Sequence, residues 1–137
     1  MKKYTITQIF GLIGVLFWSG TVLLREMQLQ DSGVFKYVLG VMPNIAAYWV
    51  CICIGEILMN KAKRDFTFMA ASIVSGVIFF LALISEIIHD RFLNSPFDMN
   101  DIAATILAIL IYLIAFCVSK QKAVRTSGMD GRKNEVS

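Results

Sequence analysis

The chain has 137 residues, of which 57% are hydrophobic and 17% are charged, and its formal net charge is +3. A soluble domain of this length could not hide so much apolar surface, because about a third of its unfolded surface stays in contact with water. Four segments are instead long and apolar enough to cross a bilayer. We therefore expect an all-α polytopic membrane protein, a bundle of four transmembrane helices, rather than a barrel whose strands would alternate polar and apolar residues.

The first predicted span covers residues 6–24 and contains no charge. Lys2 and Lys3 give it a basic start, which is also typical of a cleaved signal peptide. Its apolar part exceeds the usual length of about 7–15 residues, and no small-x-small cleavage site closes it before Arg25. We expect this segment to be a retained helix.

The second span covers residues 37–59 and is interrupted only by Asn44 and Glu56. Pro43 removes one helical hydrogen bond and should bend this helix. Glu56 is expected to snorkel, or to pair with a charge, near the basic loop that follows.

The third span covers residues 66–88, broken by Glu86, and the fourth covers residues 102–119 without a charge. Residues 1–124 are thus predicted to form one transmembrane domain. Residues 125–137 are polar and contain glycine, which predicts a flexible cytoplasmic tail.

The distribution of lysine and arginine predicts the orientation. With four spans, both termini share one side of the membrane with the loop after the second span, and ten of the 13 Lys and Arg residues fall there. The other side has Arg25, Lys36 and Arg91. The positive-inside rule then places both termini in the cytoplasm. Basic residues spread over such loops indicate contact with anionic lipid headgroups, not nucleic acid.

Metal and catalytic motifs are absent from the sequence. Cys51 and Cys53 lie two apart on one helix and point to different faces, Cys117 stands alone, and His89 is the single histidine. No metal site or cofactor is therefore predicted. There is no Gly-rich phosphate loop and no nucleophile elbow. A carboxylate–histidine pair could do acid–base work, but an enzyme is the least favoured class.

Small residues four apart predict close helix contacts, since they let membrane helices approach each other. The pairs are Ala71 with Ser75, Ser72 with Gly76, and Thr7 with Gly11, and the second span has Ala47, Cys51 and Gly55. Packing within one bundle is the preferred interpretation, and a homo- or hetero-oligomer interface is the alternative.

Polar residues of all four spans converge on the predicted outer face. Glu86, His89 and Asp90 share one helical face, and Asp101 opens the fourth span. We expect an outward-facing polar pocket built from six residues: Arg25, Asn44, Glu86, His89, Asp98 and Asp101. The alternative is that these residues only mark helix ends, with aspartates as ordinary caps and Asn44 as a helix–helix hydrogen-bond donor. If Glu86 lies below the headgroups, it must face the bundle, pair with an arginine or hold a proton.

Residues 82–116 resemble the last two membrane helices of VanZ-like proteins. Glu86 takes the position of the family's Glu, His89 that of a Gln three residues later, and Phe97-Asp98-Met99-Asn100-Asp101-Ile102 fits its F-D-x-x-D-I box. Ala104-Thr105 stands where the family has Ala-Asn, and Ala108 and Tyr112 stand where it has glycines. The family's loop Arg is missing unless Arg91 replaces it.

The resemblance implies a bacterial envelope protein that modulates susceptibility to teicoplanin-type glycopeptides or handles a lipid-linked envelope component. The residues it carries over are Glu86, His89, Asp98 and Asp101. Two other functions stay open. One is a structural or accessory subunit of a membrane complex, recruited through small-residue faces. The other is a small transporter with Glu86 as proton carrier. Two points argue against it: we expect no polar residue at mid-depth of the first, third or fourth span, and the sequence shows no inverted repeat.

Overall fold

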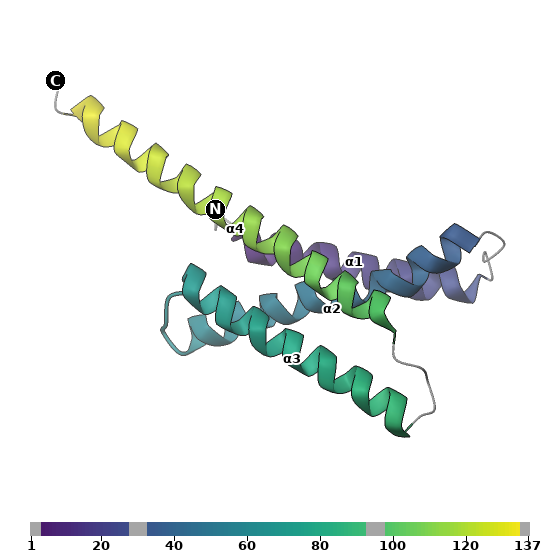
Figure 1. Cartoon of the computed structure of the whole chain (residues 1–137). Coiled ribbons are helices and arrows are strands. Elements are labelled where there is room, and N and C mark those ends of the chain that lie inside the picture. The colour runs from purple at the N-terminus through teal and green to yellow at the C-terminus, as the bar shows by residue number, and fades with distance from the viewer. Residues whose placement is uncertain (1–3, 28–32, 93–97, 135–137) are drawn as a thin grey trace.

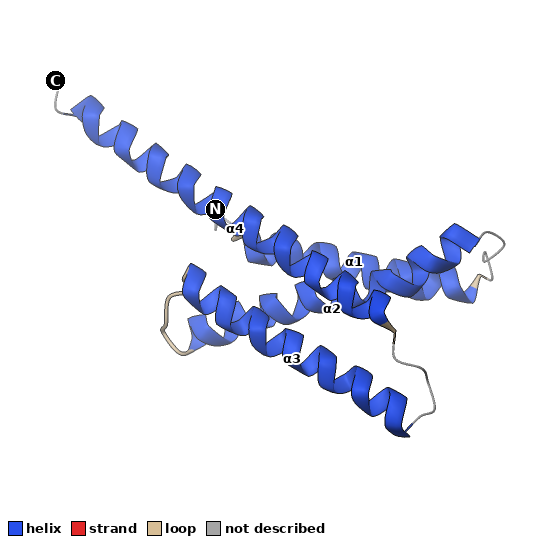
Figure 2. Ribbon diagram, in the orientation of Figure 1, coloured by secondary structure: helices blue, strands red, loops and turns tan. Residues whose placement is uncertain are grey.

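The computed structural model describes the backbone of residues 4–27, 33–92 and 98–134 and consists of four helices in that part of the chain (Figures 1 and 2). They are α1 (Ile6–Glu26), α2 (Gly33–Lys61), α3 (Phe68–Phe92) and α4 (Met99–Asn134). Each contains a stretch long and apolar enough to cross a membrane. The predicted all-α, four-span membrane architecture is confirmed.

Successive helices run in opposite directions, so the bundle has two distinct ends (Figure 1). The start of α1, the α2–α3 connection and the C-terminal part of α4 lie at one end, which we call the Glu56 end. The opposite end, called the Asp101 end, contains the end of α1, the starts of α2 and α4 and the end of α3.

The closest contact in the bundle joins α1 to α2 through glycine. A Cβ atom placed on Gly11 would lie 2.5 Å from the Cys53 Cβ, and one on Gly14 would lie 2.9 Å from the Ala46 carbonyl oxygen. Thr7, Gly11, Gly14 and Thr21 are the buried residues of α1, and Gly11 and Gly14 among them lie against α2. The predicted Thr7–Gly11 pair is therefore used inside the bundle.

Aromatic rings fill the centre of the bundle where α1, α2 and α4 meet. Phe10 packs edge-to-face on Trp49 and Tyr112, with ring centroids 5.1 Å and 5.6 Å away. The Trp49 Nε1 donates a hydrogen bond to the Ala108 carbonyl at 3.4 Å. Ala108 stands at the position where VanZ-like proteins have a glycine. Its small side chain lets the Trp49 indole approach the backbone of α4.

Helix α3 is the least enclosed of the four. Its buried residues are Ala71 and Ser75, both near its start, and none of the residues of α3 from Gly76 to Phe92 is buried. Val74 packs on Gly55 of α2, where a Cβ would lie 2.9 Å from the Val74 Cγ1. Beyond this contact α3 diverges from α2 toward the Asp101 end (Figure 1).

Three details differ from the expectations. Helix α2 begins at Gly33, before the predicted start at Tyr37. Helix α4 continues to Asn134, through most of the segment predicted to be a flexible tail. The flexibility of that segment stays a prediction. Of the predicted small-residue faces, Ala71 and Ser75 pack inside the bundle, whereas Ala47 and Cys51 are exposed because Ala46 and Trp49 face the interior instead.

Candidate functional site

At the Asp101 end, Arg25 compensates for the proline in α2. Pro43 has no N–H, so the Leu39 carbonyl one turn earlier lacks its helical donor. An Arg25 guanidinium nitrogen donates to this carbonyl oxygen at 2.9 Å. The side chain that ends α1 therefore supplies the hydrogen bond that the α2 backbone cannot make.

Asn44 follows Pro43 and joins α2 to α4. Its side chain hydrogen-bonds the half-buried Asp101 carboxylate, which also experiences the attraction of the Arg25 charge. Three of the predicted site residues from three helices thus form one cluster of Arg25, Asn44 and Asp101. A carboxylate within a membrane helix faces the bundle and has an amide and a cation nearby, as expected for such a group.

Asp98 and Glu86 hold the start of α4. An Asp98 carboxylate oxygen accepts from the Asn100 backbone N–H at 2.8 Å and from the Asn100 side-chain amide at 2.9 Å, which caps the helix. A Glu86 carboxylate oxygen accepts from the Asp98 backbone N–H at 3.4 Å. Asp98 therefore has the capping role considered from the sequence, while Glu86 links the end of α3 to the start of α4.

A shallow depression lies beside this cluster, between the first turns of α2 and the start of α4. Its volume is about 320 Å³. The Tyr37 hydroxyl donates to the Asn100 side-chain oxygen at 3.3 Å across it. The residues that line it include charged side chains of both signs and two glycines, which have no side chain to fill it: Gly33, Lys36, Tyr37, Gly40, Val41, Asp98, Asn100 and Asp101.

The structure thus brings most of the predicted residues together but not all of them. Arg25, Asn44 and Asp101 form the cluster, Asp98 lines the depression, and Glu86 reaches the same region through Asp98. His89 is fully on the exposed side of α3 and does not line the depression. The sequence did not indicate Lys36, Tyr37 and Asn100 as site residues, because Lys36 and Tyr37 lie at the predicted start of the second span and Asn100 precedes the predicted fourth span.

The Glu56 end contains polar contacts that the sequence did not predict. Glu56 is only 4% exposed, and its carboxylate accepts from the Thr5 hydroxyl at 2.7 Å. Thr5 also caps α1, where its side chain accepts from the Gln8 backbone N–H at 3.2 Å. The expectation that Glu56 snorkels toward the basic loop is wrong, because its side chain turns inward to the start of α1.

Two further polar pairs lie inside the bundle. The Thr7 and Tyr112 hydroxyls are 2.9 Å apart, and the Tyr48 and Ser75 hydroxyls are 2.7 Å apart. All four residues are buried. Tyr112 lies near the middle of the membrane-spanning part of α4, so the expectation of no polar residue at mid-depth of the fourth span is wrong.

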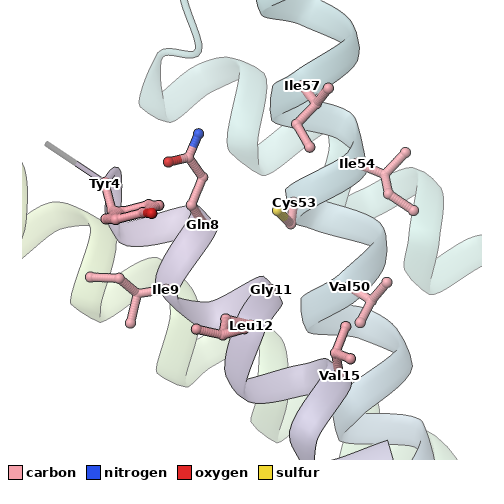
Figure 3. Close-up of a pocket in the computed structure, with 10 residues that line it drawn as sticks. All are labelled: Tyr4, Gln8, Ile9, Gly11, Leu12, Val15, Val50, Cys53, Ile54 and Ile57. Carbon is pink, nitrogen blue, oxygen red and sulfur yellow. The ribbon is translucent and has the colours of Figure 1, made fainter. Parts of the chain in front are cut away.

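A larger groove of about 750 Å³ runs along the outside of the α1–α2 contact (Figure 3). It exists because Gly11 brings the two helix backbones together while longer side chains flank the contact. Tyr4 and Gln8 stand at one end of it, and no charged residue lines it, as the residues drawn in Figure 3 show: Tyr4, Gln8, Ile9, Gly11, Leu12, Val15, Val50, Cys53, Ile54 and Ile57. The cluster and depression at the Asp101 end therefore remain the site with directed polar chemistry.

Comparisons with known proteins add no family to this picture. Neither family models, nor curated proteins, nor solved structures match the chain. The resemblance of residues 82–116 to VanZ-like proteins therefore stays a prediction. Within the described residues, no three His, Cys, Asp or Glu side chains are grouped closely enough to hold a metal ion.

Proposed function

We propose that this protein is a multi-pass protein of a bacterial cell membrane that holds the polar head of an envelope amphiphile at the Asp101 end. Both termini lie in the cytoplasm in this proposal, so the Asp101 end faces outward. The excess of Lys and Arg at the Glu56 end supports this orientation. The VanZ-like resemblance suggests that the amphiphile is a lipid-linked envelope component or a lipoglycopeptide of the teicoplanin type.

One observation carries the proposal, namely the depression of about 320 Å³ beside the Arg25–Asn44–Asp101 cluster. Lys36 supplies a cation, and Asp98 and Asp101 supply anions, so a zwitterionic or hydrogen-bonding head finds partners for both signs of charge. The cluster is preorganised, since Arg25 is bonded to the α2 backbone at Leu39 and Asn44 is bonded to Asp101. An amphiphile that resides in the membrane would reach such a head site without leaving the bilayer.

The test uses two variants, one that fills the depression and one that alters the cluster. A Cβ at Gly40 meets nothing within 4 Å, so Gly40→Leu fills the depression without a clash. We expect Gly40→Leu and Asp101→Asn to remove the protein's effect on teicoplanin susceptibility while the amount of membrane-inserted protein stays unchanged. Gly20→Leu is the matched control, because a Cβ at Gly20 also meets nothing and Gly20 does not line the depression. Wild-type behaviour of both test variants would contradict the proposal.

Orientation is tested separately. Lys61 ends α2 at the Glu56 end, and Lys36 lies at the Asp101 end. Substituted cysteines at these two positions, in a cysteine-free chain, should react differently with a membrane-impermeant maleimide added to intact cells. We expect labelling at position 36 alone, and labelling at position 61 alone would invert the topology.

A second candidate is an accessory subunit of a membrane complex. Ala47 and Cys51 favour it, since these small residues lie four apart on α2 and are exposed in the bundle. Substitution of both by Leu should then release a stoichiometric partner in pull-downs from mild detergent, whereas Ile54→Leu together with Ile57→Leu, at positions exposed on α2 but already large, should not. Identical pull-downs from both variants would argue against this function.

A further inference from the structure

A second groove lies between α3 and α4, on the side of the bundle where α3 diverges. It has a volume of about 410 Å³. Its walls include these residues of the two helices: Ser72, Gly76 and Phe79 on α3, and Ile106, Ile109 and Leu113 on α4. The depression of the proposed function is lined by other residues, so this groove is a separate feature.

The walls of the groove behave as apolar surface despite their serines. The Ser72 hydroxyl donates to the Phe68 carbonyl at 3.0 Å, and the Ser75 hydroxyl bonds to Tyr48 and to the Ala71 carbonyl. Their hydrogen-bonding capacity is thus directed at the protein itself. A hydrocarbon chain is the occupant that such a wall favours within a membrane, because no polar group of the ligand would find a partner there.

The Glu86 carboxylate stands above this groove. Glu86 follows Phe79 by seven residues, so it lies on the same face of α3 two turns further toward the Asp101 end, about 10 Å along the helix. Its carboxylate points to α4, since it accepts from the Asp98 N–H. That hydrogen bond is 3.4 Å long, and within the described residues no cation forms an ion pair with Glu86.

We propose that the α3–α4 groove binds a single-chain cationic amphiphile, whose hydrocarbon chain lies along Gly76 and Phe79 and whose ammonium group pairs with Glu86. The complementarity of charge selects the head, and the apolar wall selects the chain. Glu86 lies six residues before the end of α3, near the level at which a lipid headgroup meets the hydrocarbon layer. An amphiphile would therefore place both of its parts at their ordinary depth.

The experiment uses the full chain in phosphatidylcholine vesicles and a long-chain alkylammonium ion that carries a photoreactive diazirine near its chain end. An alcohol and an alkyl sulfate with the same chain serve as reference probes. Labelled residues are identified by mass spectrometry, and labelling of the exposed α1 residues Leu12 and Leu16 is the measure of general contact with membrane lipid. We expect the ammonium probe to label Phe79 and Ile109 about fivefold more, relative to that background, than the alcohol does.

Two variants separate the head from the chain. Glu86→Gln should reduce ammonium labelling of the groove to the level of the alcohol, and Glu26→Gln, a change at an exposed carboxylate of α1, should have no effect. A Cβ at Gly76 meets nothing within 4 Å, so Gly76→Leu should fill the groove and lower labelling by all three probes. Ser72→Leu fills the same groove one turn away and replaces Gly76→Leu if that variant does not insert.

Several results would overturn the inference. Equal labelling by the three probes would mean that ordinary membrane lipid covers the groove without selection. Crosslinks between two copies of a variant that carries a photoreactive amino acid at position 79 would mean that a second chain covers it. Because Gly40→Leu alters only the depression and Gly76→Leu only the groove, failure here and failure of the proposed function are distinguishable.

Discussion

The two ends of the bundle handle their polar residues in opposite ways. From the Glu56 end inward, buried polar side chains pair with hydroxyl groups of other helices or helix caps, as Glu56 does with Thr5 and Thr7 does with Tyr112. At the Asp101 end they are half-buried or exposed, and they bond to backbone atoms as often as to side chains. In the proposed function, the Glu56 end stabilises the bundle, whereas the Asp101 end keeps polar groups available for a ligand.

Helix packing follows the same division. Gly11 and Gly55 allow α1, α2 and α3 to touch near the Glu56 end. Gly40, near the Asp101 end, and Gly76, in the first half of α3, have open space where a side chain would be. Glycine therefore closes the α1–α2 and α2–α3 contacts at Gly11 and Gly55, whereas Gly40 and Gly76 leave open space, and substitutions at the two kinds of glycine test this difference most directly.

The largest expected effect is at Gly11. Gly11→Leu would drive a side chain into Cys53, so the helices must separate, and we expect the free energy of unfolding to fall by about 3 kcal/mol. The measurement is unfolding in mixed micelles followed by far-UV circular dichroism. Gly20→Leu is the control and should change the free energy by less than about 0.5 kcal/mol, since nothing lies near that position. Equal effects of the two substitutions would remove the distinction between closed and open glycines.

The next effect is at the Thr5–Glu56 pair. Thr5→Val removes both the cap of α1 and the donor to a buried carboxylate, and we expect a loss of about 2 kcal/mol in the same unfolding assay. Thr5→Ser keeps the hydroxyl and should be within about 0.5 kcal/mol of the parent. A Val variant as stable as the parent would show that the Glu56 end does not depend on this hydrogen bond.

A smaller effect is expected at Arg25, and it depends on Pro43. Arg25→Met leaves the Leu39 carbonyl without a donor, which should cost about 1 kcal/mol. In a Pro43→Ala background, the N–H of residue 43 can bond to that carbonyl, so the same Arg25→Met change should cost much less. The double-mutant cycle measures this coupling, and additive effects would mean that Arg25 does not replace the missing helical hydrogen bond.

The smallest effect is expected at Glu86. Its hydrogen bond to the Asp98 N–H is long and exposed, so Glu86→Gln should change the free energy of unfolding by less than about 0.5 kcal/mol. If the Glu56 end stabilises the bundle and the Asp101 end binds ligands, Glu86→Gln should alter ligand binding but not stability. A loss above 1 kcal/mol would make Glu86 a structural residue of the kind found at the Glu56 end.

Some of the site could be predicted from the sequence because polar residues in apolar helices are easily recognised. The convergence of Arg25, Asn44 and Asp101 was predicted from their depth in the spans, and in the structure these three side chains interact at one end of the bundle. His89 was grouped with Glu86 because both share a helical face, but α3 diverges from the bundle and leaves His89 exposed. Depth can be read from a hydropathy pattern, whereas the rotation and tilt of a helix depend on its neighbours.

The sequence by itself determined that four helices cross a membrane, because only a helix pairs its backbone within one apolar segment. It also located the ionisable residues near the ends of those helices. Only the tertiary structure decided that Glu56 faces Thr5 and that α3 leaves a groove beside α4. Such contacts join residues far apart in the chain, and packing of side-chain shapes, which no local pattern records, selects among the possible rotations of apolar helices.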